Sequence, residues 1–371
     1  MTGRWVHTGF RTCGLIGLAM AICTALVLAV HLHLPLSMIL LMALVGSLAS
    51  YAVLIATIVV IGAERWVFYH HALATACAVV LCLLALNQPL LRYLDVASVG
   101  LMVLLACGRL GCFLVGCCHG RPADWGVSYG PEHVAAGFPR DLAGVQLIPV
   151  QAAEGLWVAL VAAVGSRIIW TGAVPGASFS WCLIAYGGGR FLLELWRGDR
   201  DRELHCDLRE AQWTSLLLVA LVALLQIAGW LPRSTWQLAL ACGWTVVAAA
   251  IFFRNSRRPL VQHLLRPNHV RELALAVDRV RAGNRVSVQR TSMGVRISGA
   301  SFTGSEDQRC VYTMSTEGRE MDAYTALMLA RLMRRLRHSH DEIDVVAGQP
   351  GIFHLVVRSP ASPPMPPAFS I

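Results

Sequence analysis

The side chains best suited to chemistry in this sequence are ionisable groups placed inside apolar stretches. The strongest example is IAYGGGRFLLELWRGDRDR at residues 184–202, where Arg190, Glu194 and Arg197 follow Tyr186 by four, eight and eleven residues. On an α-helix these positions fall within about 80° of one another and form one polar stripe. Charged groups at membrane depth are costly and face the protein interior or a wet cavity, so the stripe predicts a functional site. The alternative is a self-neutralising Arg190–Glu194 pair, with Arg197 extending to the lipid headgroups.

Another arginine, Arg109, lies near the end of an apolar stretch, and its nearest downstream carboxylate is Asp124. Such an arginine needs a counter-charge from another helix or from an anionic ligand. Arg109 and Arg190 together would form a two-arginine clamp. Because guanidinium groups bind phosphate through paired hydrogen bonds, the natural ligand of this clamp in a bilayer is a lipid phosphate.

Two further segments offer a base and a carboxylate. The segment VFYHHALA contains His70 and His71, which could supply a general base near neutral pH or could simply be hydrogen-bonded at the membrane interface. The segment IPVQAAEGLW places Gln151 and Glu154 three residues apart, on one face of a helix. Glu154 is either the partner of one of the arginines or an exposed residue at the start of a helix.

A cluster of sulfur and imidazole side chains, Cys112, Cys117, Cys118 and His119, follows Arg109 directly. The C-x₂-C spacing typical of zinc sites is absent, so we assign no metal site from the sequence. Four interpretations stay open: a metal site, a disulfide from Cys112, a nucleophilic thiol beside the arginines, or simple packing of small residues. Seven other cysteines lie singly in apolar runs and are interpreted as small hydrophobic residues.

The elements that position these groups are predicted to be membrane-spanning helices. Of the 371 residues, 56% are hydrophobic and 14% are charged, against about 25% charged in soluble domains. The mean hydropathy is +0.57. Apolar runs long enough to cross a bilayer predict eight spans, at residues 13–31, 36–61, 67–86, 95–117, 150–170, 177–196, 211–231 and 236–253. We interpret the first as a transmembrane helix rather than a removed signal peptide.

The composition changes after the last span, which predicts a second domain. The fold class expected is an all-α polytopic membrane protein with seven to eight helices and a small C-terminal α+β soluble domain. The predicted boundaries are a membrane domain at 1–255, the soluble domain at 256–358 and a proline-rich disordered tail at 359–371. Residues 268–283 and 322–338 have helical periodicity, residues 285–290 and 294–299 alternate like hairpin strands, and residues 351–358 form a closing strand. The soluble domain contains no motif that carries chemistry.

The positive charge is distributed unevenly along the chain. The formal net charge is +9, and all basic residues are arginines in membrane-flanking loops and the C-terminal region, which does not favour nucleic-acid binding. With eight spans and both termini inside, the outer loops contain only Arg92 and Arg233. The inner loops would contain Arg65, Arg121, Arg140, Arg197, Arg200, Arg202 and Arg209. This distribution obeys the positive-inside rule.

The four chemistry-bearing segments, in this order, resemble the prolipoprotein diacylglyceryl transferase family. That family has a His-Gly-Gly-Leu loop, a Gly-Arg-x-Gly-Asn-Phe-x-Asn-x-Glu-x-x-Gly-Arg signature, a Pro-x-Gln-x-x-Glu segment and a Tyr-Gly-x-x-Arg-Phe-x-x-Glu-x-x-Arg helix. His70 takes the place of the loop histidine, and the signature aligns without gaps with residues 108–121. The third motif aligns with Pro149, Gln151 and Glu154. The fourth motif matches fully, at Tyr186, Gly187, Arg190, Phe191, Glu194 and Arg197.

The resemblance covers about residues 67–200 and implies a multi-pass enzyme of the bacterial inner (plasma) membrane without a cofactor. Its substrates would be phosphatidylglycerol, or a similar anionic phospholipid, and the lipobox cysteine of a prolipoprotein signal peptide. Arg109 and Arg190 would hold the lipid phosphate, and His70 would help to deprotonate the thiol. The other residues implied at the substrate site are Tyr186, Glu154, Glu194, Arg197, Gln151 and Arg121. The alternative is a non-enzymatic lipid-binding receptor or scaffold that retains the two-arginine pocket.

The sequence departs from the family at part of the signature. The positions of two asparagines and a glutamate are occupied by Cys112, Val115 and Cys117, and the glycine pair after the histidine is His71-Ala72. Three polar groups are therefore replaced by weak or absent hydrogen-bonding groups.

Overall fold

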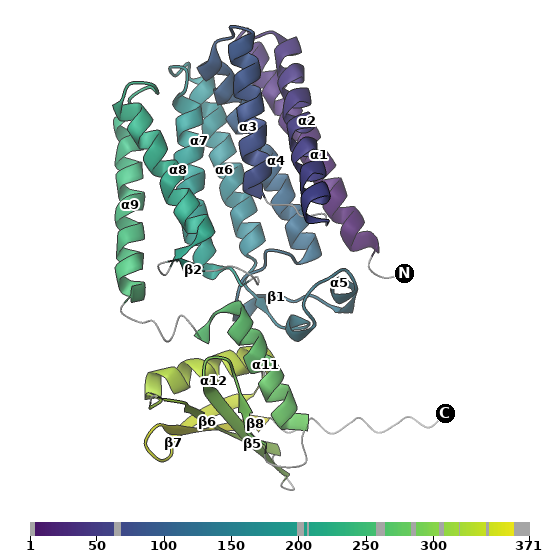
Figure 1. The fold of residues 1–371 in the computed structure, drawn as a ribbon, viewed down its shortest axis with the longest axis vertical. Helices are drawn as coiled ribbons and strands as arrows, with labels where there is room; N and C mark the ends of the chain where they lie inside the picture. The colour runs from purple at the N-terminus through teal and green to yellow at the C-terminus, as the bar shows by residue number, and fades with distance from the viewer. Residues whose placement is uncertain are drawn as a thin grey trace.

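The computed structural model describes residues 4–62, 68–198, 204–205, 208–256, 264–282, 287–303, 308–318, 320–338 and 341–359. They form an upright bundle of helices with a small α+β unit at one end (Figure 1). Arg65, Arg200, Arg202 and residues 360–371 of the predicted tail lie outside the described residues.

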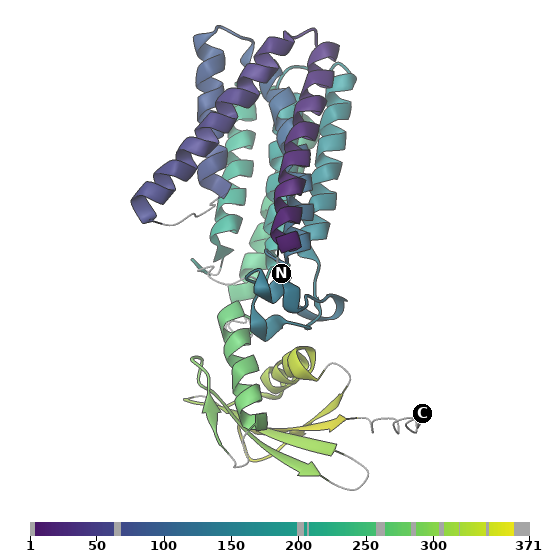
Figure 2. The ribbon, with the colours of Figure 1, turned by 90° about the vertical axis from the view of Figure 1, so that its right-hand side faces the viewer.

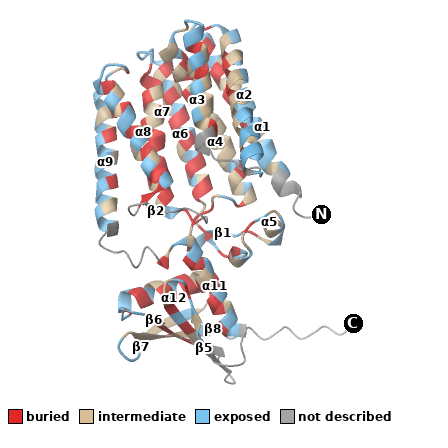
Figure 3. Cartoon of the chain, in the orientation of Figure 1, coloured by how far each residue is buried: buried red, intermediate tan, exposed pale blue. Residues whose placement is uncertain are grey.

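The bundle contains helices at all eight predicted spans. They are α1 (Arg4–His31), α2 (Leu36–Ile61), α3 (Phe68–Ala85), α4 (Leu90–Val115), α6 (Val150–Trp170), α7 (Ala177–Leu193), α8 (Glu210–Ile227) and α9 (Thr235–Ser256). Six of these, all except α3 and α7, have described segments long and apolar enough to cross a membrane. Many residues on the outer helices of the bundle are exposed (Figure 3). They include large apolar side chains such as Leu48 and Val59, as expected for lipid-facing helices. The prediction of a polytopic helical membrane protein is confirmed.

The centre of the bundle is built from α4, α6 and α7, and a buried carboxylate sets how α7 begins. Asp95 of α4 accepts hydrogen bonds of 2.7 Å from the backbone N–H groups of Gly176 and Phe179. These are among the N–H groups that have no partner within the helix itself, so Asp95 caps α7 from a neighbouring helix. The cap fixes α7 against α4, and therefore fixes where the polar stripe of α7 lies.

The predicted single helix over residues 177–196 ends earlier than expected. α7 stops at Leu193, Glu194–Trp196 form a 3₁₀ turn, and Arg197 is extended. The chain leaves the helix because it pairs with the segment after α4: the Arg121 N–H donates to the Trp196 carbonyl (2.9 Å), and the Gly198 N–H donates to the His119 carbonyl (2.9 Å). This pairing draws Arg197 and Arg121 to the same end of the bundle.

The long segment between α4 and α6 contains β1 (Pro122–Val127), α5 (Pro131–Ala135) and a 3₁₀ turn (Arg140–Leu142). It shares one hydrophobic core with the C-terminal part of the chain, in which Tyr129, Phe138 and Leu147 belong to the same cluster as Val270 and Leu273. Ion pairs reinforce the contact. Arg334 and Arg335 reach the Asp124 carboxylate at 2.9 and 3.2 Å.

The C-terminal α+β unit has an antiparallel five-stranded sheet of order β4-β5-β6-β8-β7. Its helices, α11 (Pro267–Ala282) and α12 (Ala323–Arg337), lie on the side of the sheet toward the bundle (Figure 2). The strands are β4 (Gln289–Arg290), β5 (Val295–Thr303), β6 (Gln308–Thr316), β7 (Glu342–Ala347) and β8 (Ile352–Ser359), and a separate hairpin joins β2 (Leu204–His205) and β3 (Leu208–Arg209). Both helices, the β4–β5 hairpin and β8 correspond to predicted elements, whereas β6 and β7 were not predicted.

Candidate active site

The centre of the candidate site is the carboxylate of Glu154, one turn into α6. Glu154 is only 1% exposed, so the alternative interpretation, an exposed residue at the start of a helix, is wrong. Nη2 of Arg109, on α4, lies 2.8 Å from Oε1 of Glu154. A Cβ at Gly155 would stand 3.3 Å from the Cβ of Arg109, so the glycine allows α4 to approach α6 closely at this point. The counter-charge that Arg109 requires thus comes from another helix.

Arg190 links Glu154 to a second buried carboxylate. Its Nη2 lies 2.8 Å from Oε2 of Glu194, one turn further along the chain, and its Nε lies 3.8 Å from Oε1 of Glu154. Arg109 and Arg190 therefore flank the same carboxylate oxygen. The structure therefore brings together the two arginines of the predicted clamp, Arg109 and Arg190, although they are 81 residues apart in the sequence.

Two more arginines complete the surroundings of the carboxylates. Arg197 is 1% exposed, so it does not extend to the headgroups, and its guanidinium lies 3.9 Å from Glu154 and 4.0 Å from Glu194. Arg209 precedes α8, and its Nη1 lies 3.1 Å from Oε1 of Glu194 and donates to the Arg197 carbonyl at 3.3 Å. Arg209 was not among the predicted site residues. Its only signal was its position directly before an apolar run.

The fifth arginine of the cluster, Arg121, has no ion pair within 4.0 Å to a carboxylate of the described residues. Burial, followed by the positive charge of Arg209, lowers the pKa of its guanidinium to about 10, against the opposing effect of Glu194. The buried Nε of Arg121 and Nη1 of Arg190 have no hydrogen-bond partner in the described part of the chain. Five arginines and two glutamates therefore gather at this place among the described residues. Unpaired buried donors of guanidinium groups are suited to bind an anion.

The remaining predicted substrate-site residues, Tyr186 and Gln151, lie on different helices. Tyr186 is buried on α7, one turn before Arg190. Gln151 donates to the Cys117 carbonyl at 2.8 Å and to the Tyr129 hydroxyl at 3.4 Å, so it holds the segment after α4 against α6. The predicted histidine base is not tested, because the side chain of His70 lies outside the described residues. Its neighbour His71 is buried, with Nδ1 2.9 Å from the Ser50 hydroxyl.

The glycines of α7 provide close contact with aromatic rings rather than with a ligand. A Cβ at Gly189 would overlap the indole of Trp157, and one at Gly188 would overlap the indole of Trp244. The Trp157 indole N–H donates to the Ala185 carbonyl at 3.1 Å. The indole of Trp157 therefore packs α6 against α7, and the indole of Trp244 packs α9 against α7.

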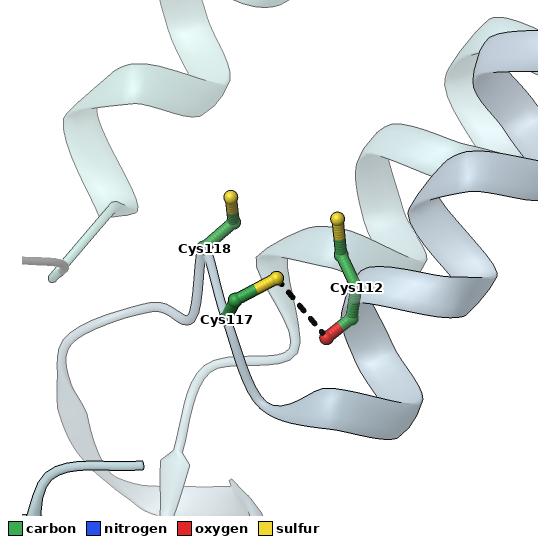
Figure 4. Close-up of side chains that lie close together, drawn as sticks. All are labelled: Cys112, Cys117 and Cys118. Atoms are coloured by element: carbon green, nitrogen blue, oxygen red, sulfur yellow. Dashed lines mark hydrogen bonds between the residues drawn. The ribbon is translucent and has the colours of Figure 1, made fainter. Parts of the chain in front are cut away.

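The cysteines that follow Arg109 gather in space. The Sγ atoms of Cys112, Cys117 and Cys118 all lie within 4.8 Å of one another, and none of the three is in a disulfide (Figure 4). Hydrogen bonds from the Cys112 and Cys117 thiols, and then the charges of Arg197 and Arg109, hold the pKa of the Cys118 thiol well below its usual range. His119 does not join the cluster, and its Nδ1 lies 2.9 Å from the Gly120 carbonyl oxygen.

The fold and the site together define the class of the protein. It is a polytopic membrane protein with a buried arginine–glutamate cluster where α4, α6 and α7 meet the segments beyond the bundle. The sequence matches the model of the prolipoprotein diacylglyceryl transferase family over residues 18–228, more than half of the chain. The chain therefore belongs to this family.

Curated relatives carry the same description at low identity. The chain is 30% identical over 140 residues to phosphatidylglycerol–prolipoprotein diacylglyceryl transferase 2 of Clostridium perfringens, a match that covers 36% of this chain and 51% of the relative. It is 28% identical over 137 residues to the corresponding enzyme of Clostridium tetani, covering 36% and 52%. For that of Dehalococcoides mccartyi the values are 32% over 128 residues, covering 34% and 47%. The chain thus spans about half the length of these relatives, and no solved structure matches it.

Proposed function

We propose that this chain transfers the diacylglyceryl group of phosphatidylglycerol, or of a similar anionic phospholipid, to the thiol of a prolipoprotein lipobox cysteine. The observation that carries the proposal is a pair of buried guanidinium donors, Nη1 of Arg190 and Nε of Arg121, that have no hydrogen-bond partner in the described part of the chain. A phosphodiester is the anion that a lipid would present at this depth. The names of the curated relatives specify the same donor and acceptor for those proteins.

In this reaction the acceptor sulfur attacks the glyceryl carbon bonded to the phosphate oxygen. A C–S bond forms, the C–O bond breaks with its electron pair going to the phosphate, and glycerol phosphate leaves. The thiol proton passes to a base and finally to the leaving phosphate or to solvent. Because negative charge grows on the phosphate as the C–O bond breaks, guanidinium groups fixed in advance stabilise the transition state more than the bound lipid.

The two glutamates act as positioning residues in this proposal. Glu154 and Glu194 fix the guanidinium groups of Arg109, Arg190 and Arg197, while leaving some donors unused. Preorganised donors cost no reorganisation when the phosphate leaves. His70 stays our predicted base for the acceptor thiol.

We also propose that the protein resides in the bacterial inner membrane. The cluster lies at the end of the bundle where α4 ends, α6 begins and the C-terminal α+β unit packs. The family resemblance favours the outer face for this end, whereas the arginine distribution favours the cytoplasmic face. Accessibility labelling of a single cysteine introduced at Trp125, an exposed residue of β1, in intact cells decides between the two.

The function is tested with purified protein in nanodiscs that contain phosphatidylglycerol labelled in its headgroup, together with a lipobox peptide. We expect release of labelled glycerol phosphate and a matching mass increase of the peptide. Arg190→Lys keeps the charge but loses the planar donor fork, and should lower the rate about 10²- to 10³-fold, the usual effect of removing one transition-state donor. The matched control is Arg167→Lys, at the exposed opposite end of α6. A folded wild-type protein that binds the lipid but never modifies the peptide would refute the transferase function and leave a lipid-binding receptor.

A further inference from the structure

The three cysteines after Arg109 lie close together because two residues with left-handed backbone turn the chain directly after α4. Gly116 ends α4 with a φ of 82°, and Cys118 has a φ of 58°, a left-handed conformation that residues other than glycine rarely adopt. The two left-handed residues return Cys117 and Cys118 to the last turn of α4, where Cys112 lies. Gln151 fixes the loop from α6 through its 2.8 Å hydrogen bond to the Cys117 carbonyl.

The geometry of the three thiols fits a thiolate metal site. Their Sγ atoms lie within 4.8 Å of one another, whereas sulfur ligands of a tetrahedral zinc ion with Zn–S bonds of about 2.3 Å are about 3.8 Å apart. Each sulfur would therefore move by less than an ångström, which is within reach of a side-chain rotation. Cys117 is exposed, so an ion can reach the three thiols from outside the bundle.

The surroundings suit the charge that such a site would have. Three thiolates and one Zn²⁺ carry a net charge of −1, and the guanidinium groups of Arg109 and Arg197 interact electrostatically with the thiols. Thiolate ligands favour zinc over the hard cations magnesium and calcium. A zinc ion with three protein ligands keeps a fourth position open, which is typical of catalytic rather than structural zinc.

We propose that Cys112, Cys117 and Cys118 bind a zinc ion, and that its fourth coordination position receives the sulfur of the acceptor substrate. The second part rests on the proposed transferase function. A thiol that binds zinc loses its proton and remains a nucleophile beside the arginines that hold the lipid phosphate. Zinc would thereby supply an activated acceptor at the place where the family signature has asparagine and glutamate.

The metal site is tested on the full-length protein purified in detergent with a reductant. We expect about one zinc ion per chain by elemental analysis, and thiolate-to-cobalt charge-transfer absorption after exchange with Co²⁺. Cys117→Ser should abolish both signals, whereas the control Cys242→Ser, an exposed cysteine of α9, should retain them. Cys118→Gly is a second variant that removes a ligand while relieving the left-handed backbone, so it should fold.

Three results would overturn the metal site: folded wild-type protein that binds neither zinc nor cobalt, a disulfide between two of the three cysteines in protein isolated from membranes, or binding of copper(I) with exclusion of zinc. The acceptor position is tested separately by adding the lipobox peptide to the cobalt-loaded protein. A change of the charge-transfer spectrum with the cysteine peptide, but not with its serine analogue, supports it, and an unchanged spectrum overturns it. These readouts do not require turnover, so failure of the transferase reaction and failure of the metal site are distinguishable.

Discussion

The Glu154 carboxylate offers the sharpest test of the arginine–glutamate cluster. Glu154→Gln is nearly isosteric and keeps one side-chain oxygen, but removes the negative charge shared by three arginines. We expect the variant to be less stable than the wild type and to lose transferase activity, because its arginines repel one another and no longer hold their positions.

The expected loss of stability follows from the geometry. Two of the three contacts of the Glu154 carboxylate, to Arg190 at 3.8 Å and to Arg197 at 3.9 Å, are too long for hydrogen bonds. These two contacts are therefore purely electrostatic. At an effective dielectric constant of about 20, each such contact contributes about 4 kcal/mol of gross attraction, most of it offset by desolvation. Removing one member of a buried ion pair costs about 3–5 kcal/mol. The contact to Arg109 does not have hydrogen-bond geometry either, so the loss is mainly electrostatic, and we expect the free energy of unfolding to fall by about 3 kcal/mol.

The measurement is denaturant unfolding in mixed micelles, with Glu210→Gln as the matched control, because Glu210 is exposed at the start of α8. Glycerol phosphate should stabilise Glu154→Gln more than the wild type, since the anion replaces the missing charge. If the variant unfolds within about 1 kcal/mol of the wild type, a difference typical of surface substitutions, the proposed electrostatic role of Glu154 is refuted.

Three further substitutions test the elements that position the site. Gly189→Ala places a Cβ against the Trp157 indole and should cost about 1–3 kcal/mol, measured by thermal unfolding and by a shift of tryptophan fluorescence. Asp95→Asn weakens the cap of α7 and should cost about 1–3 kcal/mol, with faster amide exchange in its first turn as the readout and unchanged exchange refuting the cap. Hydrogen bonds from Arg335 and Arg334 lower the pKa of Asp124. The contact between Asp124 and α12 should therefore be complete above the usual pKa of a carboxyl group, and it should weaken as the pH falls through the lowered pKa of Asp124. Amide exchange of α12 should become faster over the same pH range. Asp124→Asn should remove this pH dependence of the exchange.

Much of the bundle could be predicted from the sequence, because lipid imposes simple rules on it. Runs of apolar residues must be helices where no water is available for the backbone, so the eight helical ranges follow from hydropathy alone. The same cost of burying charge predicted that Arg109 needs a counter-charge from another helix or from an anionic ligand. Glu154, at the start of the next apolar run after the long loop, supplies this counter-charge in the structure.

The parts that were missed depend on contacts between distant segments. α7 ends at Leu193 because the following residues hydrogen-bond to the segment after α4, and no local signal in a sequence with good helix formers marks that end. Arg209 joins the site through the hairpin before α8, so its inclusion is a tertiary effect. Strand β7 was missed because it is an edge strand whose half-exposed residues do not alternate between buried and exposed, whereas β6 is an internal strand between β5 and β8.

The convergence of the cysteines changes how the departure from the family signature is interpreted. From the sequence, Cys112 and Cys117 replace hydrogen-bonding residues of the family signature, and a metal site, a disulfide, a nucleophilic thiol and simple packing all stay open. In the structure these two thiols meet a third, Cys118, directly beside the guanidinium groups that the family shares. A loop that had merely lost its role would not need a left-handed Cys118 to bring the three sulfurs together. We therefore interpret the change at Cys112 and Cys117 as an exchange of hydrogen-bonding side chains for thiols at the same place, with the arginines of the family motifs kept.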